Sequence, residues 1–254
     1  MAKSSQRTLS YIYVLITVLV LVSIIKNFNS LSEYDIIILN GEVIDGSGSP
    51  SIFKDVGIIG NIIHKIGNLK SSEAKRHIDA EGLVVSPGFI DVHAHLDPIL
   101  RLSNTESHVR QGVTTSLGGP DGSSPWPIGK FLDTLNQIGV GMNVAYLVGH
   151  NTVRRNVMGL ENRAPSKEEL NEMKNQISAG MDEGAYGIST GLKYLPGSFS
   201  KVEEVIELSK KASEKGGVYT SHLRDEGLGV IASVNEAIQI SKDANIPVVL
   251  THHK

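Results

Sequence analysis

The sequence predicts an α/β protein: an incomplete TIM-like (β/α) barrel of about six of the eight units, preceded by a small β domain and an N-terminal hydrophobic helix. Three observations lead to this prediction. Short β-prone runs crowd the first third of the chain, strand-like and helix-like runs alternate after it, and histidines fall at the ends of several of the later strands. With 254 residues, 40% hydrophobic content and 20% charge, the chain can bury a substantial core.

The N-terminal residues differ from the rest of the chain. Lys3 and Arg7 precede an uncharged apolar run over residues 8–25, and Lys26 closes it. This run is near the lower end of the roughly 17–25 residues that span a bilayer, and it also suits the apolar region of a signal peptide. Residues 1–30 are therefore expected to be a signal peptide or membrane anchor. The chain is expected to be exported, either membrane-anchored or periplasmic/extracellular, with the basic end in the cytoplasm.

Residues 34–85 carry the pattern of a small β domain. Short apolar runs are broken by Gly, Asn, Asp and Pro, as hairpins require. These runs are YDIIILNGEVID, DVGIIGNIIHKIG and RHIDAEGLVVSP.

Residues 86–254 alternate between strand-like and helix-like runs, which predicts a parallel sheet with helical crossovers. The strand-like runs are FIDVHAH, VTTSLGG, NVAYLVGH, AYGISTG, GVYTSHL and PVVLTHH, and the amphipathic helices include residues 167–183, 201–215 and 229–243. The region is shorter than the roughly 250 residues of a complete barrel, so the barrel is expected to stop after strand six. An open doubly wound sheet competes with this architecture, but it would not explain histidines at three separate strand ends.

The run VVSPGFIDVHAHLDP carries the first indication of a metal site. His93 and His95 are two residues apart, so on a strand both would project from one face. Asp91 and Asp97 are near enough to orient imidazole N–H groups, as carboxylates beside metal-bound histidines do. Histidines at this spacing also line solvated strands, so this motif alone leaves both possibilities open.

Two later strand ends carry the same residue type. His222 lies at the end of GVYTSHL, and His252 lies at the end of PVVLTHH. Because Thr251-His252 parallels Ser221-His222, His252 and not His253 is expected to face the barrel interior. Four imidazoles at one end of a barrel would suit one or two divalent metal ions, zinc being the usual choice. The chain has no cysteine, so any metal must be held by nitrogen and oxygen. His150, at the end of NVAYLVGH, could reach substrate or have a structural role.

Charge argues against one class of partner. The formal net charge is -3, and no long basic block follows the N-terminal segment, so nucleic-acid binding is not expected.

These motifs together resemble the amidohydrolase superfamily, and within it the D-aminoacylase or N-acyl-D-amino-acid deacylase group. The resemblance rests on PGFIDVHAHLD, QGVTTSLGG, NVAYLVGHNTVRRNVMG, GAYGISTGLKYLPG, GGVYTSHLRDEG and PVVLTHHK, in that order. It implies a metal-dependent hydrolase of a linear amide whose substrate is a small-molecule N-acyl-D-amino acid. It also implies that residues 34–85 are a segment of a small β-sandwich. By matched position, His93 and His95 would hold one metal and His222 and His252 the other, with zinc as the expected cofactor.

The resemblance also implies substrate contacts. Tyr194 in GLKYLPG and Lys254 in THHK match positions that contact substrate in this group. Arg224 in SHLRDEG is a further candidate near the pocket, and His150 a candidate for the substrate or intermediate oxyanion. Tyr194, Arg224 or Lys254 could pair with a substrate carboxylate.

Two departures from the group's pattern matter. Where the better-known deacylases have a metal-binding cysteine, this chain has Asp121 in a Gly-Pro-Asp-Gly turn, where it could bridge two cations or be a simple turn residue. The group's catalytic aspartate lies at the end of strand eight, so no catalytic residue is assigned within these 254 residues. The chain is accordingly expected to be an inactive fragment of a longer enzyme, unless another chain supplies the missing part.

Two other functions remain open at this stage. A cyclic-amide hydrolase of the dihydroorotase or hydantoinase kind shares the His-x-His strand, but those enzymes usually carry a carboxylated lysine on strand four. Here that strand is AYGISTG, with no lysine before Lys193. A membrane-tethered binding protein with a degenerate site is the alternative from a different class.

Overall fold

A computed structural model of the chain describes residues 33–252. The chain divides into two units, Met1–Pro87 and Gly88–Lys254. The predicted signal peptide or anchor (residues 1–30) lies outside the described residues, as do His253 and Lys254. Within residues 33–252, no helix has both the length and the apolar character needed to cross a membrane.

The first unit contains a five-stranded sheet. Its strands are β1 (Tyr34–Val43), β2 (Ile52–Ile59), β3 (Ile62–Gly67), β4 (Ala74–Asp79) and β5 (Val84–Val85). The order is β3-β2-β1-β4, with β5 also beside β1. β1 pairs antiparallel with β2, and β2 with β3, whereas β4 and β5 run parallel to β1. Tyr34, Ile37 and Leu69 form its small core, and the buried Asp55 carboxylate ties the chain together by accepting hydrogen bonds from the backbone N–H groups of Asn40 and Leu69.

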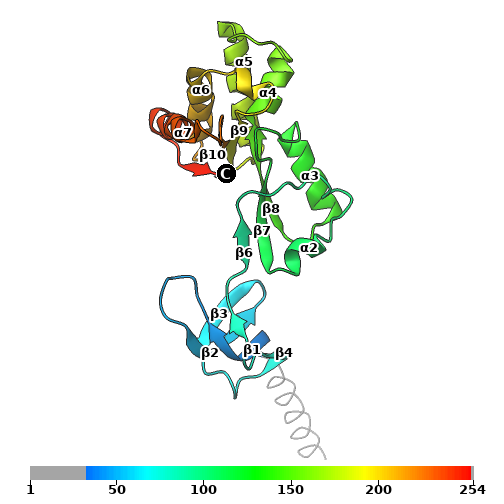
Figure 1. Cartoon of the computed structure of the whole chain (residues 1–254). Coiled ribbons are helices and arrows are strands. Elements are labelled where there is room, and N and C mark those ends of the chain that lie inside the picture. Colours follow the sequence, from blue (N-terminus) through cyan, green and yellow to red (C-terminus); the bar gives the residue numbers. More distant parts are fainter. Residues whose placement is uncertain (1–32, 253–254) are drawn as a thin grey trace, which may run out of the picture. The chain divides into compact units, whose positions relative to one another are not determined.

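The second unit contains a six-stranded, all-parallel sheet, shown in Figure 1. Its strands are β6 (Phe89–Asp91), β7 (Val113–Gly118), β8 (Asn143–Gly149), β9 (Gly187–Gly191), β10 (Val218–His222) and β11 (Val248–Leu250). Each strand pairs with its neighbour in sequence. Sequential parallel order is the topology of a (β/α) barrel, so the prediction of an incomplete barrel is confirmed, and the open doubly wound sheet is not what forms.

Helices follow the strands. They are α2 (Glu106–Val109), α3 (Ile128–Ile138), α4 (His150–Met158), α5 (Lys167–Asp182), α6 (Val202–Ser213) and α7 (Val230–Ala244), with a short 3₁₀ turn η1 (Gly197–Phe199). The start of α5 shows how sequence sets a boundary: the Ser166 side chain accepts from the Glu169 N–H, and the Glu169 carboxylate accepts from the Ser166 N–H. This capping box satisfies backbone donors that a helix end leaves open.

The core of this unit lies between the sheet and its helices. Fully buried side chains from both layers fill it, including Leu147, Met173, Ile177, Ile188, Leu208 and Tyr219. Because all six strands are parallel, their carboxyl ends meet at one edge of the sheet. The segments that follow β6, β7, β9, β10 and β11 therefore share one region, and most of the predicted site residues are on them.

Two predicted strands are shorter than expected. β6 ends at Asp91, so His93 and His95 follow it, and β11 ends at Leu250, so His252 follows it. The Asp91 carboxylate accepts the His93 N–H at 3.0 Å, and the Ala94 N–H still donates to the Leu117 carbonyl on β7 at 3.1 Å. The expectation that His93 and His95 are part of a strand is therefore wrong, although both side chains come together.

Candidate metal centre

Asp121 occupies the turn that follows β7, and the backbone of this turn is unusual. Gly119, Asp121 and Gly122 all have positive φ, at 72°, 54° and 77°. Glycine adopts this conformation at little cost, and aspartate is among the residues that tolerate it best. Ser189 on β9 links both ends of the turn, since its hydroxyl donates to the Gly119 carbonyl at 2.6 Å and accepts the Gly122 N–H at 3.1 Å.

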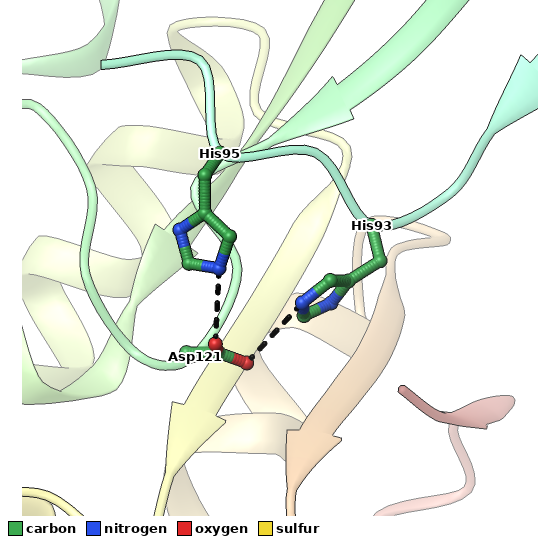
Figure 2. A group of neighbouring side chains, drawn as sticks. All are labelled: His93, His95 and Asp121. Carbon is green, nitrogen blue, oxygen red and sulfur yellow. Dashed lines mark ion pairs between the residues drawn. The ribbon is translucent and has the colours of Figure 1, made fainter. Parts of the chain in front are cut away.

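The turn directs the Asp121 carboxylate toward four imidazoles. Figure 2 shows His95 and His93 on one side of it. His95 Nε2 lies 3.2 Å from Oδ2, and His93 Nε2 lies 3.7 Å from Oδ1. His222 Nδ1 lies 3.6 Å from Oδ1, and His252 Nε2 lies 3.9 Å from the same oxygen. The predicted histidines from three strand ends and the predicted aspartate therefore meet at one point.

The imidazole rings also contact one another in series. His93 is next to His95 and to His252, each with 5.4 Å between ring centroids, and His252 is 4.3 Å from His222. The Tyr194 ring continues the series at 4.5 Å from His222. The nitrogen and oxygen atoms form two groups of metal-competent ligands that share Asp121: His93, His95 and Asp121, and Asp121, His222 and His252.

Burial supports a cation at this point. Asp121 Oδ1 is buried, yet within residues 33–252 it makes no hydrogen bond, and leaving such an atom unsatisfied costs about 1–3 kcal/mol. Two ligands that are each about 2.1 Å from one cation lie roughly 3.0–3.7 Å apart. The carboxylate-to-imidazole distances of 3.2 to 3.9 Å are in or just beyond this range, and those to His93, His222 and His252 are longer than ordinary N–H···O hydrogen bonds. The residues fit a divalent metal.

Protonation agrees with that conclusion. Burial lowers the pKa of the His93 imidazole; Asp121 opposes the shift, while His95 and His252 reinforce it. A lowered pKa keeps His93 neutral near pH 7, and neutral imidazole is the form that binds metals.

Glu226 belongs to the same cluster, although nothing in the sequence beyond its place in SHLRDEG predicts a role for it. Its Oε1 contacts His252 Nδ1, and its Oε2 lies 3.5 Å from His222 Nε2. The available signal was an acid four residues after a histidine that ends a strand, but this spacing alone does not show that the carboxylate also reaches His252.

Asn151 is a second residue that the sequence did not indicate. It is 1% exposed at the start of α4, and its amide donates to the carbonyls of Gly191 and Tyr194 at 3.1 and 3.3 Å. A Cβ added at Gly122 would lie 2.2 Å from Asn151 Oδ1, so the two are tightly packed. Asn151 thus holds the Tyr194 segment and packs against the turn that carries Asp121.

His150 is in a different environment from the metal cluster. Its side chain is fully buried, with Nε2 2.9 Å from Glu204 Oε1 and Nδ1 3.3 Å from Asn151 Oδ1. The same Glu204 carboxylate pairs at 2.5 Å with Arg154, which is also fully buried. Both His150 ring nitrogens therefore face protein partners, and its predicted contact with substrate has no support in this geometry.

Arg224 likewise has other partners. It pairs with Glu236 at 2.8 Å and donates to the carbonyls of Ser198 and Ser200 at 3.2 and 3.1 Å. These bonds tie the segment after β10 to the segment after β9, which is a structural role. The predicted role of Lys254 stays a prediction, because that residue lies outside the described part of the chain.

Comparison with known proteins gives the family. The profile of the Amidohydrolase family matches residues 76–250. The chain belongs to the Amidohydrolase family. The D-aminoacylase of Alcaligenes xylosoxydans xylosoxydans is 36% identical to it, over 87% of this chain and 51% of that protein. This confirms the resemblance to the D-aminoacylase group.

Solved amidohydrolase structures agree with the fold. A D-aminoacylase structure that addresses the role of its binuclear metal centre superposes with a TM-score of 0.83 at 35% identity. The N-acyl-D-glutamate deacylase of Bordetella bronchiseptica, in complex with zinc and a phosphonate inhibitor, also gives 0.83, at 33% identity. Each match covers 87% of this chain and 52% of the solved one. The chain therefore spans about half the length of these relatives.

Proposed function

We propose that this chain forms the metal-binding half of an amidohydrolase that removes the acyl group from N-acyl-D-amino acids. The observation that carries the proposal is the pair of ligand groups that share the Asp121 carboxylate. The relatives support the substrate class, since the similar proteins include a D-aminoacylase and an N-acyl-D-glutamate deacylase. One or two divalent ions, zinc first, are the proposed cofactor.

The proposal gives each described residue of the cluster a role. His93 and His95 would hold one ion, His222 and His252 the other, and Asp121 would bridge them, as a carboxylate can. A divalent ion in such a site polarises a carbonyl and lowers the pKa of water. The chain's own contribution is to hold these ligands in place through the turn around Asp121.

Tyr194 is the proposed substrate contact among the described residues. Burial raises the pKa of its phenol, and the nearby carboxylates of Asp121 and Glu226 raise it further. The phenol therefore keeps its proton and can donate a hydrogen bond. Its ring lies against His222 and its side chain is half-exposed, so it can reach a substrate carboxylate beside the ions. Lys254 is proposed as the cationic partner of that carboxylate.

We propose further that the 254 residues bind metal and substrate without turning substrate over. Hydrolysis needs a group that moves a proton from water to the leaving amine, and the family resemblance assigns this role to a carboxylate. Within residues 33–252, the two carboxylates of the cluster already face imidazoles: Asp121 lies among four rings and Glu226 against two. The aspartate that the family resemblance assigns to strand eight would have to do this work.

The test is metal analysis combined with ligand binding on the full chain. We expect bound zinc that is lost in Asp121→Ala, and tighter binding of an N-acetyl-D-amino acid than of its L enantiomer, measured by calorimetry. Release of free amino acid should be absent. Preferential binding of a cyclic ureide would overturn the assignment in favour of a cyclic-amide hydrolase. A chain that binds no divalent metal would overturn it in favour of a degenerate binding protein.

Export is proposed for the N-terminal segment. The uncharged apolar run over residues 8–25 follows Lys3 and Arg7, the pattern of a signal peptide or anchor. Fractionation of cells that produce the chain should place it in the membrane or outside the cytoplasm, and deletion of residues 1–30 should leave it in the cytoplasm. A full-length chain found only in the cytoplasm would contradict this proposal.

A further inference from the structure

The cluster contains a carboxylate that faces the histidines from the side opposite Asp121. In His222, Nδ1 faces Asp121 at 3.6 Å and Nε2 faces Glu226 at 3.5 Å. In His252 the two nitrogens are exchanged: Nε2 faces Asp121 at 3.9 Å, and Nδ1 contacts Glu226. One glutamate thus lies behind two imidazoles that present different nitrogens to Asp121.

Glu226 stands outside the metal-competent group itself. The ligand atoms of Asp121, His222 and His252 lie within 4.8 Å of one another, and Glu226 is not part of this group. Its side chain is 14% exposed and that of His222 is 3% exposed, so the contacts are largely removed from water. Glu226 is therefore placed to support the metal ligands and is not itself a ligand.

The loop that carries Glu226 is fixed on both sides. The Asp225 carboxylate accepts the N–H groups of Gly227 and Gly229 at 2.8 and 3.1 Å, and the Asp225 N–H donates to the Ser233 hydroxyl at 3.0 Å. On the other side, Arg224 is held by Glu236. A carboxylate on such a loop has few other positions available, which is what positioning of two rings requires.

We infer that Glu226 is a positioning residue that sets the tautomers of His222 and His252 by accepting a ring N–H from each. A neutral imidazole that offers one nitrogen to a metal carries its proton on the other. With Glu226 as acceptor, His222 is protonated at Nε2 and offers Nδ1, whereas His252 is protonated at Nδ1 and offers Nε2. The inference rests on the proposed metal centre, and it assigns opposite tautomers to its two histidines.

The chemistry distinguishes this role from simple packing. A glutamine at position 226 has nearly the same shape, but it has one acceptor oxygen, and its NH₂ group would oppose a second ring N–H. Aspartate keeps both acceptor oxygens on a shorter side chain. Packing therefore predicts that Glu226→Gln is harmless and Glu226→Asp harmful, whereas double acceptance predicts that Glu226→Gln is the more harmful of the two.

The experiment measures zinc affinity by equilibrium dialysis in a His95→Ala background of the full chain, where only the group of Asp121, His222 and His252 is complete. We expect Glu226→Gln to bind zinc about 10–100-fold more weakly than its parent, the usual effect of losing a carboxylate behind a metal-bound histidine. Glu226→Asp should lose less. Glu203→Gln, at an exposed glutamate on α6, should match the parent.

A second readout does not depend on metal. Nitrogen-15 chemical shifts of the imidazoles in the metal-free chain report which nitrogen carries the proton. We expect Nε2–H for His222 and Nδ1–H for His252, with a mixture of tautomers in Glu226→Gln. Unchanged zinc affinity in Glu226→Gln, or the same tautomer in both rings, would overturn the inference. A parent that binds no zinc would instead overturn the proposed metal centre.

Discussion

Replacing Glu204 by glutamine removes one negative charge from a buried cluster. Glu204 is 5% exposed, and its two oxygens pair with Arg154 at 2.5 Å and with His150 at 2.9 Å. Arg154 is fully buried and also donates to the carbonyl of Arg163 at 2.7 Å. Because the arginine keeps its charge at any ordinary pH, Glu204→Gln leaves a buried guanidinium without its carboxylate.

The size of the effect follows from that burial. Removing one partner of a buried ion pair costs about 3–5 kcal/mol of unfolding free energy, a large fraction of the 5–15 kcal/mol that is typical of a whole domain. For a unit of this size, each kcal/mol shifts Tm by about 2–4 °C. The expected loss is therefore roughly 6–20 °C.

Thermal and urea unfolding followed by circular dichroism measure the loss. Glu203→Gln is the matched control, because it removes the same charge from the adjacent, exposed position on the same helix. A double variant, Glu204→Gln with Arg154→Met, should recover part of the stability, since it leaves no uncompensated arginine. Equal stability of Glu204→Gln and Glu203→Gln would refute the reasoning, because the buried pair would then contribute nothing.

The Glu204 carboxylate also predicts that the stability of the protein depends on pH. Burial alone would raise the pKa of Glu204, but His150 and Arg154 outweigh burial and hold that pKa below its usual range. The stabilisation by ionised Glu204 should therefore be complete above about pH 4.3, the ordinary glutamate pKa, and should be lost as the pH falls through the lowered pKa of the folded state. The difference in unfolding free energy between wild type and Glu204→Gln, measured in urea, should accordingly close in acid. A difference that stays constant with pH would contradict this prediction. At the metal site, Asp121→Ala should abolish zinc binding to both ligand groups in equilibrium dialysis, because its carboxylate is common to both; retention of one tight equivalent would contradict the shared role. Gly122→Ala and Gly216→Ala both place alanine at positive φ, at a cost of about 1–2 kcal/mol. Only at Gly122 would the new Cβ meet other atoms, Asn151 Oδ1 at 2.2 Å and the Gly191 backbone N at 2.6 Å, so Gly122→Ala should lose about 1–3 kcal/mol more in urea unfolding. Equal losses in the two variants would show that these neighbours move aside at no cost.

The order of elements was available from the sequence. Alternating strand-like and helix-like runs predicted the sequential parallel sheet, and the expected helices at 167–183, 201–215 and 229–243 match α5, α6 and α7 to within two residues at each end. Such patterns are local, since the hydrophobic period and the capping residues lie within one element. The same holds for the histidines that follow strands, because parallel strands bring their carboxyl ends together whatever the details of packing.

Only the tertiary structure decided which partner each polar residue has. His150 lies 54 residues from Glu204, and Arg224 turns to Glu236, although both were expected near substrate. Glu226 reaches His252 across 26 residues. A sequence shows which side chains can form ion pairs and metal ligands, but the choice among them depends on burial and on distances between elements far apart in the chain. Asp121 illustrates both: its residue type and turn were evident from the sequence, whereas its position among four imidazoles results from the fold around it.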